Sequence, residues 1–232
     1  MFRYELHMHS REASACARSS IHDMIRRYAQ LGFSGAVLTN HFIGGNTAID
    51  RSLPWKALVR AYAQPYYDGV ETARALNFDL LFGVEQGYGK GKEFLVYGVE
   101  PEYLAARPRL RNAGPEEWAE AVHEAGGFFA YAHPFRQRDY ITDPGEIPDM
   151  TFADGVEVFN RCNLPGDNAE ALRVFGKSGT ILIAGSDTHD TGFDDPWAVE
   201  FSHRVSTGPE LATALRENSF RLWLGTEYYT GL

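Results

Sequence analysis

Seven histidine and carboxylate residues in this chain are spaced as metal ligands would be. His7 and His9 are separated by one residue, so in an extended segment their rings point to the same side and can chelate one ion. Asp187 and His189 repeat this spacing far along the sequence. Imidazole and carboxylate together suit zinc, manganese or iron, whereas calcium prefers oxygen ligands alone. The other members of the set are His41, Glu85 and His133.

Each of these seven residues stands where a predicted β-strand ends. A single histidine in such a place is more often a hydrogen-bonded structural residue than a ligand. In a (β/α) barrel, however, the C-terminal ends of all the strands meet at one mouth, where active sites are built. The joint placement therefore predicts a metal cluster at that mouth. The apolar or β-branched stretches that predict strands are residues 2–6, 35–39, 80–84, 94–99, 128–132, 155–159 and 181–184.

Helical patterns alternate with these strands, and this alternation predicts a parallel sheet with helices outside it. Seven strands in 232 residues favour a small, irregular barrel, and an open doubly wound sheet is the alternative. We expect a single domain over residues 1–232, because no linker or internal repeat divides the sequence. The predicted helices cover residues 22–31, 66–76, 116–125, 169–177 and 210–217, the first of them capped by Ser20.

The connection over residues 42–64 is long for a strand-to-helix loop. It contains Trp55 and Tyr62, and Tyr66 and Tyr67 follow it. Aromatic rings above a metal site could stack on a base or a sugar. The run W-K-A-L-V-R-A-Y is also typical of a short helix packed on the barrel, and we favour this second interpretation.

Charge and composition exclude several classes of function. The chain has 22 basic and 31 acidic side chains, a formal net charge of −9. Proteins that bind long nucleic acids usually present a basic face, so the charge argues against that activity, although a local metal or arginine cluster can still attract a small anion. We find no apolar run of the ~18 residues that a membrane helix needs and no secretory signal. Cys16 and Cys162 cannot form a disulfide framework, so we expect a cytoplasmic protein.

Taken together, the motifs resemble those of the PHP family, the polymerase-and-histidinol-phosphatase metal-dependent phosphoesterases. E-L-H-M-H-S, L-T-N-H, G-V-E, A-H-P-F-R, E-V-F-N and G-S-D-T-H follow in the family's order over residues 1–190. The resemblance implies a distorted seven-stranded (β/α) barrel with two or three divalent ions at its mouth. It further implies a first ion held by His7, His9, Glu85 and Asp187, a second by Glu85 and His133, and a third by His41 and His189.

Three positions depart from the family pattern. Asn40 precedes His41 where the family usually has Asp, which removes a carboxylate that would orient the His41 ring. Glu93 stands where many members have a further histidine, and we expect it to bind the second ion. Cys16 is placed as a ligand of the third ion, where a thiolate would favour zinc or iron. A small residue buried in a turn is the equal alternative for Cys16.

The resemblance implies that the protein hydrolyses a phosphate monoester of a small metabolite, such as histidinol phosphate or a nucleotide, by attack of metal-bound hydroxide. Glu85, Asp187 and His189 are the expected catalytic residues. Arg136 and Arg161 are expected to bind the phosphate, because a guanidinium forks onto two oxygens. The alternatives are an amidohydrolase-type metal hydrolase and a catalytically silent, metal-binding regulatory module.

Overall fold

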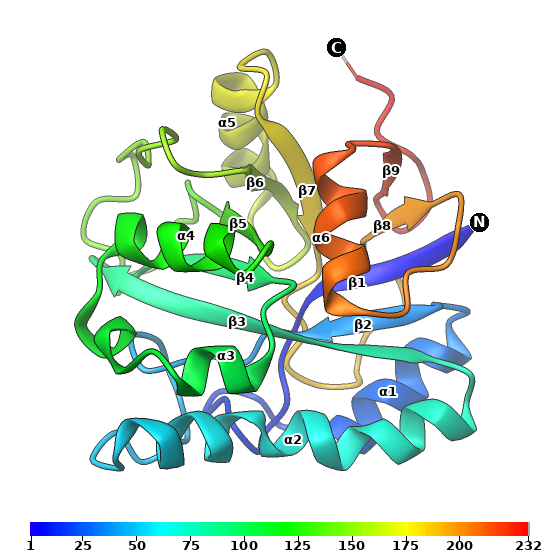
Figure 1. Ribbon diagram of the computed structural model, residues 1–232. Helices are drawn as coiled ribbons and strands as arrows, with labels where there is room; N and C mark the ends of the chain where they lie inside the picture. The colour runs from blue at the N-terminus through cyan, green and yellow to red at the C-terminus, as the bar shows by residue number, and fades with distance from the viewer. Residues whose placement is uncertain (232) are drawn as a thin grey trace.

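Nine strands form one sheet in the computed structural model, which describes residues 1–231 (Figure 1). Their order is β7-β6-β5-β4-β3-β2-β1-β8-β9. The strands are β1 (Phe2–Met8), β2 (Gly35–Leu38), β3 (Asp79–Gly89), β4 (Lys92–Tyr97), β5 (Phe128–Tyr131), β6 (Gly155–Asn160), β7 (Ile181–Gly185), β8 (Ala198–Phe201) and β9 (Phe220–Trp223).

The sheet is nearly closed into a barrel. The backbone N–H of His9, just after β1, donates to the carbonyl of Thr188, just after β7, at 2.9 Å. A parallel bridge between Met8 and Thr188 accompanies this bond. The strands at the two ends of the run β1 to β7 therefore meet at the edge where the candidate ligands lie.

The sheet is mixed, whereas the sequence predicts a parallel one. The pairs β1–β2, β2–β3, β5–β6 and β6–β7 are parallel, but β4 runs antiparallel to both β3 and β5. The seven predicted strands correspond to β1–β7, while β8 and β9 extend the sheet beyond β1, so the predicted count of seven is not confirmed. Because β4 is reversed, its first residues, and not its last, lie at the mouth.

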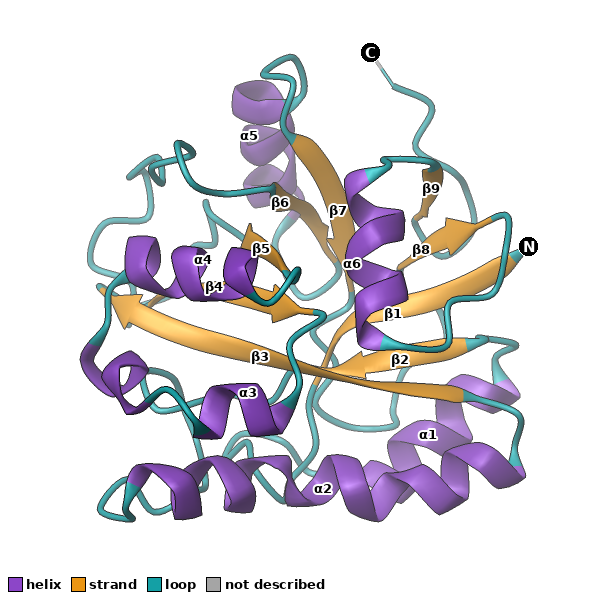
Figure 2. Ribbon diagram, viewed as in Figure 1, coloured by secondary structure: helices purple, strands orange, loops and turns teal. Residues whose placement is uncertain are grey.

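The helices lie outside the sheet, and α1 and α2 run side by side along it (Figure 1; Figure 2). The side chain of Ser20 caps α1 as predicted, accepting the N–H of Asp23 at 3.2 Å. Within residues 1–231, no helix combines the length and the apolar character that crossing a membrane requires. The helices are α1 (Ile21–Gln30), α2 (Trp55–Ala75), α3 (Pro101–Ala105), α4 (Pro115–Glu124), α5 (Pro165–Phe175) and α6 (Gly208–Arg216), with a 3₁₀ turn at Pro108–Asn112.

α2 corrects the prediction that a helix starts at residue 66. It begins at Trp55 and continues through Pro65, although proline removes one backbone hydrogen bond. Trp55, Leu58 and Tyr62 recur at helical spacing and are buried, and this apolar stripe holds the helix on the barrel. The Trp55 indole N–H donates to the carbonyl of Leu104 at 2.8 Å. Trp55 and Tyr62 are thus core residues, as the helix interpretation predicts.

Gly83, in the middle of β3, shows how closely the barrel is packed. A Cβ atom at this position would lie 2.6 Å from Cγ1 of Val37 and 2.9 Å from Cγ2 of Thr39.

Gly83→Ala should therefore lower the free energy of unfolding by about 1–3 kcal/mol, because the added methyl group overpacks the core. Urea denaturation measures the change. Gly166→Ala is the matched control, since a Cβ there meets no atom within 4 Å, and it should leave stability unchanged or slightly raised. Equal stability of the two variants would contradict the close packing around Gly83.

Candidate metal centre

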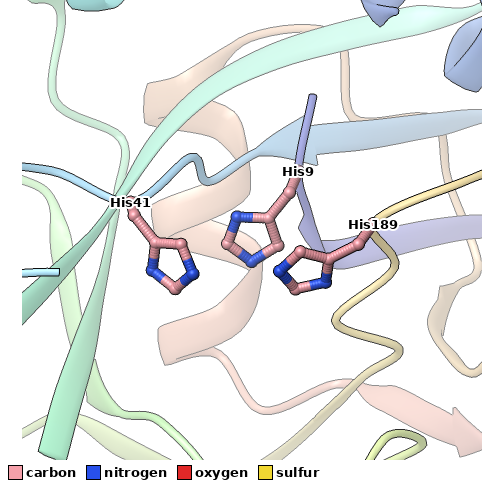
Figure 3. Close-up of side chains that lie close together, drawn as sticks. All are labelled: His9, His41 and His189. Carbon is pink, nitrogen blue, oxygen red and sulfur yellow. The ribbon is translucent and has the colours of Figure 1, made fainter. Parts of the chain in front are cut away.

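The seven predicted ligands come together at one edge of the sheet. His9, His41 and His189 lie side by side there, with ring centroids 4.5 Å apart for His9 and His41 and 4.2 Å apart for His9 and His189 (Figure 3). His9 follows β1, His41 follows β2 and His189 follows β7. Strand ends far apart in the sequence thus place their imidazoles in one cluster, as the strand-end pattern predicts.

Glu85, on β3, faces four imidazoles. Its Oε1 lies 3.1 Å from Nε2 of His7 and 3.1 Å from Nε2 of His133. Its Oε2 lies 2.7 Å from Nδ1 of His41 and 3.4 Å from Nε2 of His9. The carboxylate is completely buried. Glu85 therefore stands where a single ligand could bridge two ions.

Asp187 supplies a second carboxylate on the β7 side of the cluster. Its Oδ1 lies 2.9 Å from Nε2 of His9 and 3.4 Å from Nε2 of His7. Its other oxygen, Oδ2, accepts a hydrogen bond from Nη2 of Arg136 at 2.6 Å. The two oxygens of Asp187 are thus divided between the imidazoles and the guanidinium.

Five buried ligand atoms of this cluster have no hydrogen-bond partner within the described part of the chain. Buried polar atoms are almost always paired, so a group of orphans in one place calls for an explanation. Each of these atoms lies 2.7–3.4 Å from another of them, but the angles at these contacts do not suit a hydrogen bond. A divalent ion would satisfy such atoms, and the mixed nitrogen and oxygen set suits zinc, manganese or iron. The atoms are Nε2 of His7, Nε2 of His9, Nδ1 of His41, Oε2 of Glu85 and Oδ1 of Asp187.

The electrostatics of the cluster without ions support this assignment. Burial favours the neutral form of Glu85, but the charges of His41 and His7 outweigh it and hold the pKa of the carboxyl well below its usual range. Burial lowers the pKa of His41, but Glu85 outweighs it and raises the pKa well above its ordinary value. Burial and the neighbouring rings of His189 and His41 lower the pKa of His9. Protons on some rings thus balance the negative charge of the buried carboxylates, and bound cations would replace these protons.

Two of the candidate ligands have a strained backbone. His133 has φ of 27° and Asp187 has φ of 54°, in the left-handed region that non-glycine residues rarely adopt. Such conformations cost about 1–3 kcal/mol each and persist where the surroundings hold them, often at functional sites. Here they turn the chain sharply after β5 and β7.

Two buried glutamates that the sequence analysis did not assign hold the His7 segment in place. Oε1 of Glu157 lies 3.0 Å from Nδ1 of His7, and its Oε2 accepts the backbone N–H of His133 at 3.2 Å. Oε1 of Glu5 accepts the backbone N–H groups of His7 and Ser186, each at 2.8 Å. Donation from Nδ1 of His7 to this carboxylate would leave Nε2 to present a lone pair to an ion. A carboxylate directly between two apolar or aromatic residues of a predicted strand is the sequence signal that could have identified both residues.

Asn40 acts on His9, not on the His41 ring. The amide oxygen of Asn40 accepts the hydroxyl proton of Ser14 at 2.9 Å. The Ser14 oxygen lies 3.0 Å from Nδ1 of His9 and accepts the backbone N–H of His41 at 2.9 Å. With its only proton committed to Asn40, Ser14 must accept from Nδ1 of His9. The substitution of Asn for the family's Asp therefore leaves the tautomer of His9 fixed through Ser14.

Glu93 and Cys16 both reach the cluster. Glu93 is the second residue of β4, and its Oε1 lies 3.1 Å from Nδ1 of His41 while its Oε2 lies 3.7 Å from Nε2 of His133. The Cys16 side chain is exposed, which disfavours a buried residue in a turn. Partial desolvation raises the pKa of its thiol, but hydrogen bonds with His189 and His41 outweigh this and lower the pKa to about 6. The position of both side chains is compatible with the predicted ligand roles.

The two predicted phosphate-binding arginines differ in their surroundings. Arg136 is buried, and besides Asp187 it donates to Oδ1 of Asn160 at 2.9 Å and to Oδ1 of Asn163 at 2.7 Å. Arg161 instead donates to Oδ1 of Asp195 at 2.9 Å, and within the described residues it does not line the cavity at the cluster. Arg161 thus lies outside the described lining of the cavity, and its phosphate contact stays a prediction.

A cavity of about 440 Å³ opens directly onto the cluster. This volume is in the range of small-molecule sites. Its walls include six of the residues discussed above: Cys16, His41, Glu93, Arg136, Asp187 and His189.

Neither a family model nor a curated protein matches this sequence. Solved structures do match it in shape. A two-domain protein of Bacteroides vulgatus that contains a predicted PHP-like metal-dependent phosphoesterase aligns with a TM-score of 0.66 at 16% identity, over 98% of this chain and 66% of its own length. This chain thus spans slightly less than two thirds of that protein.

Two further structures have different named activities. An amidohydrolase of Chromobacterium violaceum aligns with a TM-score of 0.58 at 15% identity, over 97% of this chain and 98% of that one. A lesion-specific endonuclease of Pyrococcus furiosus aligns with a TM-score of 0.57 at 13% identity, over 93% of this chain and 56% of that one. The comparison confirms the resemblance to PHP-like proteins at the level of the fold, and such low identities establish the fold alone.

Glu157→Gln should weaken zinc binding about 10–100-fold, because an amide can donate to Nδ1 of His7 and move the ring proton onto the atom that faces the cluster. Titration of metal-free protein with Zn²⁺ against a chromophoric chelator measures the affinity. Glu200→Gln is the matched control, since Glu200 is another buried carboxylate but pairs with Arg3 and Arg221. Equal zinc affinities of the two variants would contradict the role of Glu157.

Proposed function

We propose that this chain is a metal-dependent hydrolase of phosphate monoesters that acts on a small phosphorylated metabolite. The observation that carries the proposal is the group of five buried, unpartnered ligand atoms beside a cavity of about 440 Å³. Net charge supports a small substrate over a long nucleic acid, since the chain carries −9 and offers no basic excess for a phosphate backbone.

The residues present fit two or three divalent ions. In this proposal, Glu85 is shared between ions, because its two oxygens face different imidazoles. When bound, such ions polarise a phosphoryl oxygen and lower the pKa of a water molecule toward neutrality. His7, His9, Glu85 and Asp187 would hold one ion, Glu85, Glu93 and His133 a second, and Cys16, His41 and His189 a third.

The chain's own side chains would orient the substrate and exclude water from it. Arg136 already shares one N–H with Asp187 and lines the cavity, so a phosphate beside Asp187 would meet its guanidinium. His189 is the most exposed ring of the cluster, at 27% of its side-chain surface. Its Nδ1 lies 2.8 Å from the carbonyl of Asp187, so a donating Nδ1–H leaves Nε2 free to bind an ion or to contact the leaving oxygen.

Amide hydrolysis is the second candidate, because one structural neighbour is named an amidohydrolase. Amidohydrolases of the His-x-His type normally use a carbamylated lysine or a glutamate on a later strand. The lysine at this cavity, Lys92, donates to the carbonyls of Pro134 and Glu146 at 2.9 and 2.8 Å, so its ammonium is committed to the backbone. These contacts argue against a carbamylated lysine here, so amide hydrolysis would need the form of site that uses a glutamate.

Protein loaded with Zn²⁺, Mn²⁺ or Fe²⁺ should hydrolyse phenyl phosphate and leave acetanilide intact, and Glu85→Gln should reduce phosphate release at least about 100-fold because a ligand of more than one ion is lost. His123→Gln is the control, since His123 pairs with Asp154 on the surface and should keep normal turnover. Amide turnover without phosphate release would favour the second candidate, and metal binding without any turnover would favour a silent module.

Arg136→Ala should lower kcat/KM for phenyl phosphate on the order of 10–100-fold, since a hydrogen bond to a charged group contributes roughly 1.5–3 kcal/mol. Arg136→Lys should recover only part of this loss, because a point charge cannot fork onto two oxygens. Arg161→Ala is the matched control and should retain wild-type kinetics. Similar losses in Arg136→Ala and Arg161→Ala would contradict the distinction drawn from their contacts.

A further inference from the structure

Part of the cavity wall at the cluster has a different chemistry from the metal ligands. Besides the candidate ligands, the lining includes Gly87, Gly89 and Gly91 of the β3–β4 hairpin, which contribute no side chains, together with Lys92 and Tyr140. No atom lies within 4 Å of where a Cβ of Gly89 would be. The wall is therefore open at Gly89, and the cavity offers backbone surface and one aromatic ring in addition to the metal ligands.

Hydrogen bonds between the β3–β4 hairpin and the loop that carries Tyr140 hold this residue in position. Nζ of Lys92 donates to the carbonyl of Pro134 at 2.9 Å and to that of Glu146 at 2.8 Å, so one ammonium joins both ends of segment 134–146 to β4. The N–H of Thr142 donates to the carbonyl of Lys90 at 3.2 Å. The loop that carries Tyr140 is thus fixed at three points against the hairpin.

The side chain of Tyr140 is largely exposed at the cavity. The residue is 59% exposed, and it lines the cavity. A Cβ at Gly91 would lie 3.0 Å from Cδ2 of Tyr140, so the edge of the ring rests on that glycine. An aromatic ring held in this way at a polar site leaves its exposed face as an apolar surface, and flat ligands stack on such rings.

We propose that Tyr140 forms a subsite for a planar ring in the alcohol part of the substrate, so that the preferred phosphate esters carry an aromatic or heteroaromatic group. This inference rests on the proposed function, because the phosphate anchors the ester at the candidate ligands. The substrate ring then stacks on the exposed face of Tyr140. The sequence offered Trp55 and Tyr62 as residues that could stack on a substrate, but both are buried in the core. Among the described residues, Tyr140 places its ring at the cavity.

Two phosphonates test the subsite without turnover, because their C–P bond is not cleaved by ester hydrolysis. The dissociation constants of benzylphosphonate and ethylphosphonate are measured by calorimetry on zinc-loaded protein. The wild type should bind benzylphosphonate about 5–10-fold more tightly, as expected for one aromatic stacking contact. Tyr140→Ala should bring the ratio of the ethylphosphonate to the benzylphosphonate dissociation constant to about one. Tyr140→Phe should restore the wild-type ratio.

Tyr67→Ala is the matched control, since Tyr67 is also an exposed aromatic residue but lies on α2 and bonds Glu102. It should keep the wild-type ratio. A wild-type ratio near one, an unchanged ratio in Tyr140→Ala, or failure of benzylphosphonate to bind would overturn the subsite. Hydrolysis of phenyl phosphate by the same samples tests the proposed function separately, so turnover with a ratio of one would reject the subsite alone.

Discussion

The buried carboxylate of Glu85 is the contact on which the rest of the candidate site depends. Its two oxygens lie 2.7–3.4 Å from imidazole nitrogens of four histidines that come from β1, from the ends of β2 and β5 and from the segment after β1. A single buried charge of this kind is costly to remove from water unless opposite charges compensate it. Protons on the rings can do so in part, and divalent ions would do so while also satisfying the unpartnered atoms.

The surrounding fold serves to hold these groups together. Closure of the barrel between Met8 and Thr188 brings the His-x-His segment beside Asp187. Glu157 fixes the His7 ring, Ser14 fixes the His9 ring, and the guanidinium of Arg136 orients Asp187. The backbone is left-handed at both His133 and Asp187, and the N–H of His133 donates to Glu157. Two strained residues and several buried charges therefore lie together at this edge of the sheet.

The strand-end pattern predicts the ligand cluster because side chains at the C-terminal ends of parallel strands must meet. It does not predict the reversed β4, and so it cannot explain why Glu93, the second residue of that strand, reaches the mouth. The ion pair of Arg161 with Asp195 and the course of α2 through Pro65 depend on tertiary contacts that no local pattern records. The strand-end pattern does not single out Glu5 and Glu157, because these carboxylates lie within strands.

Anomalous diffraction from crystals grown with Zn²⁺ tests the central claim most directly, because it locates the ions independently of activity. The account predicts two or three anomalous peaks at the zinc edge, with at least one about 2.0–2.2 Å from a Glu85 oxygen and from an imidazole nitrogen of the cluster. Zinc-loaded crystals with no peak within coordination distance of Glu85, or with peaks only at surface histidines such as His123, would contradict it.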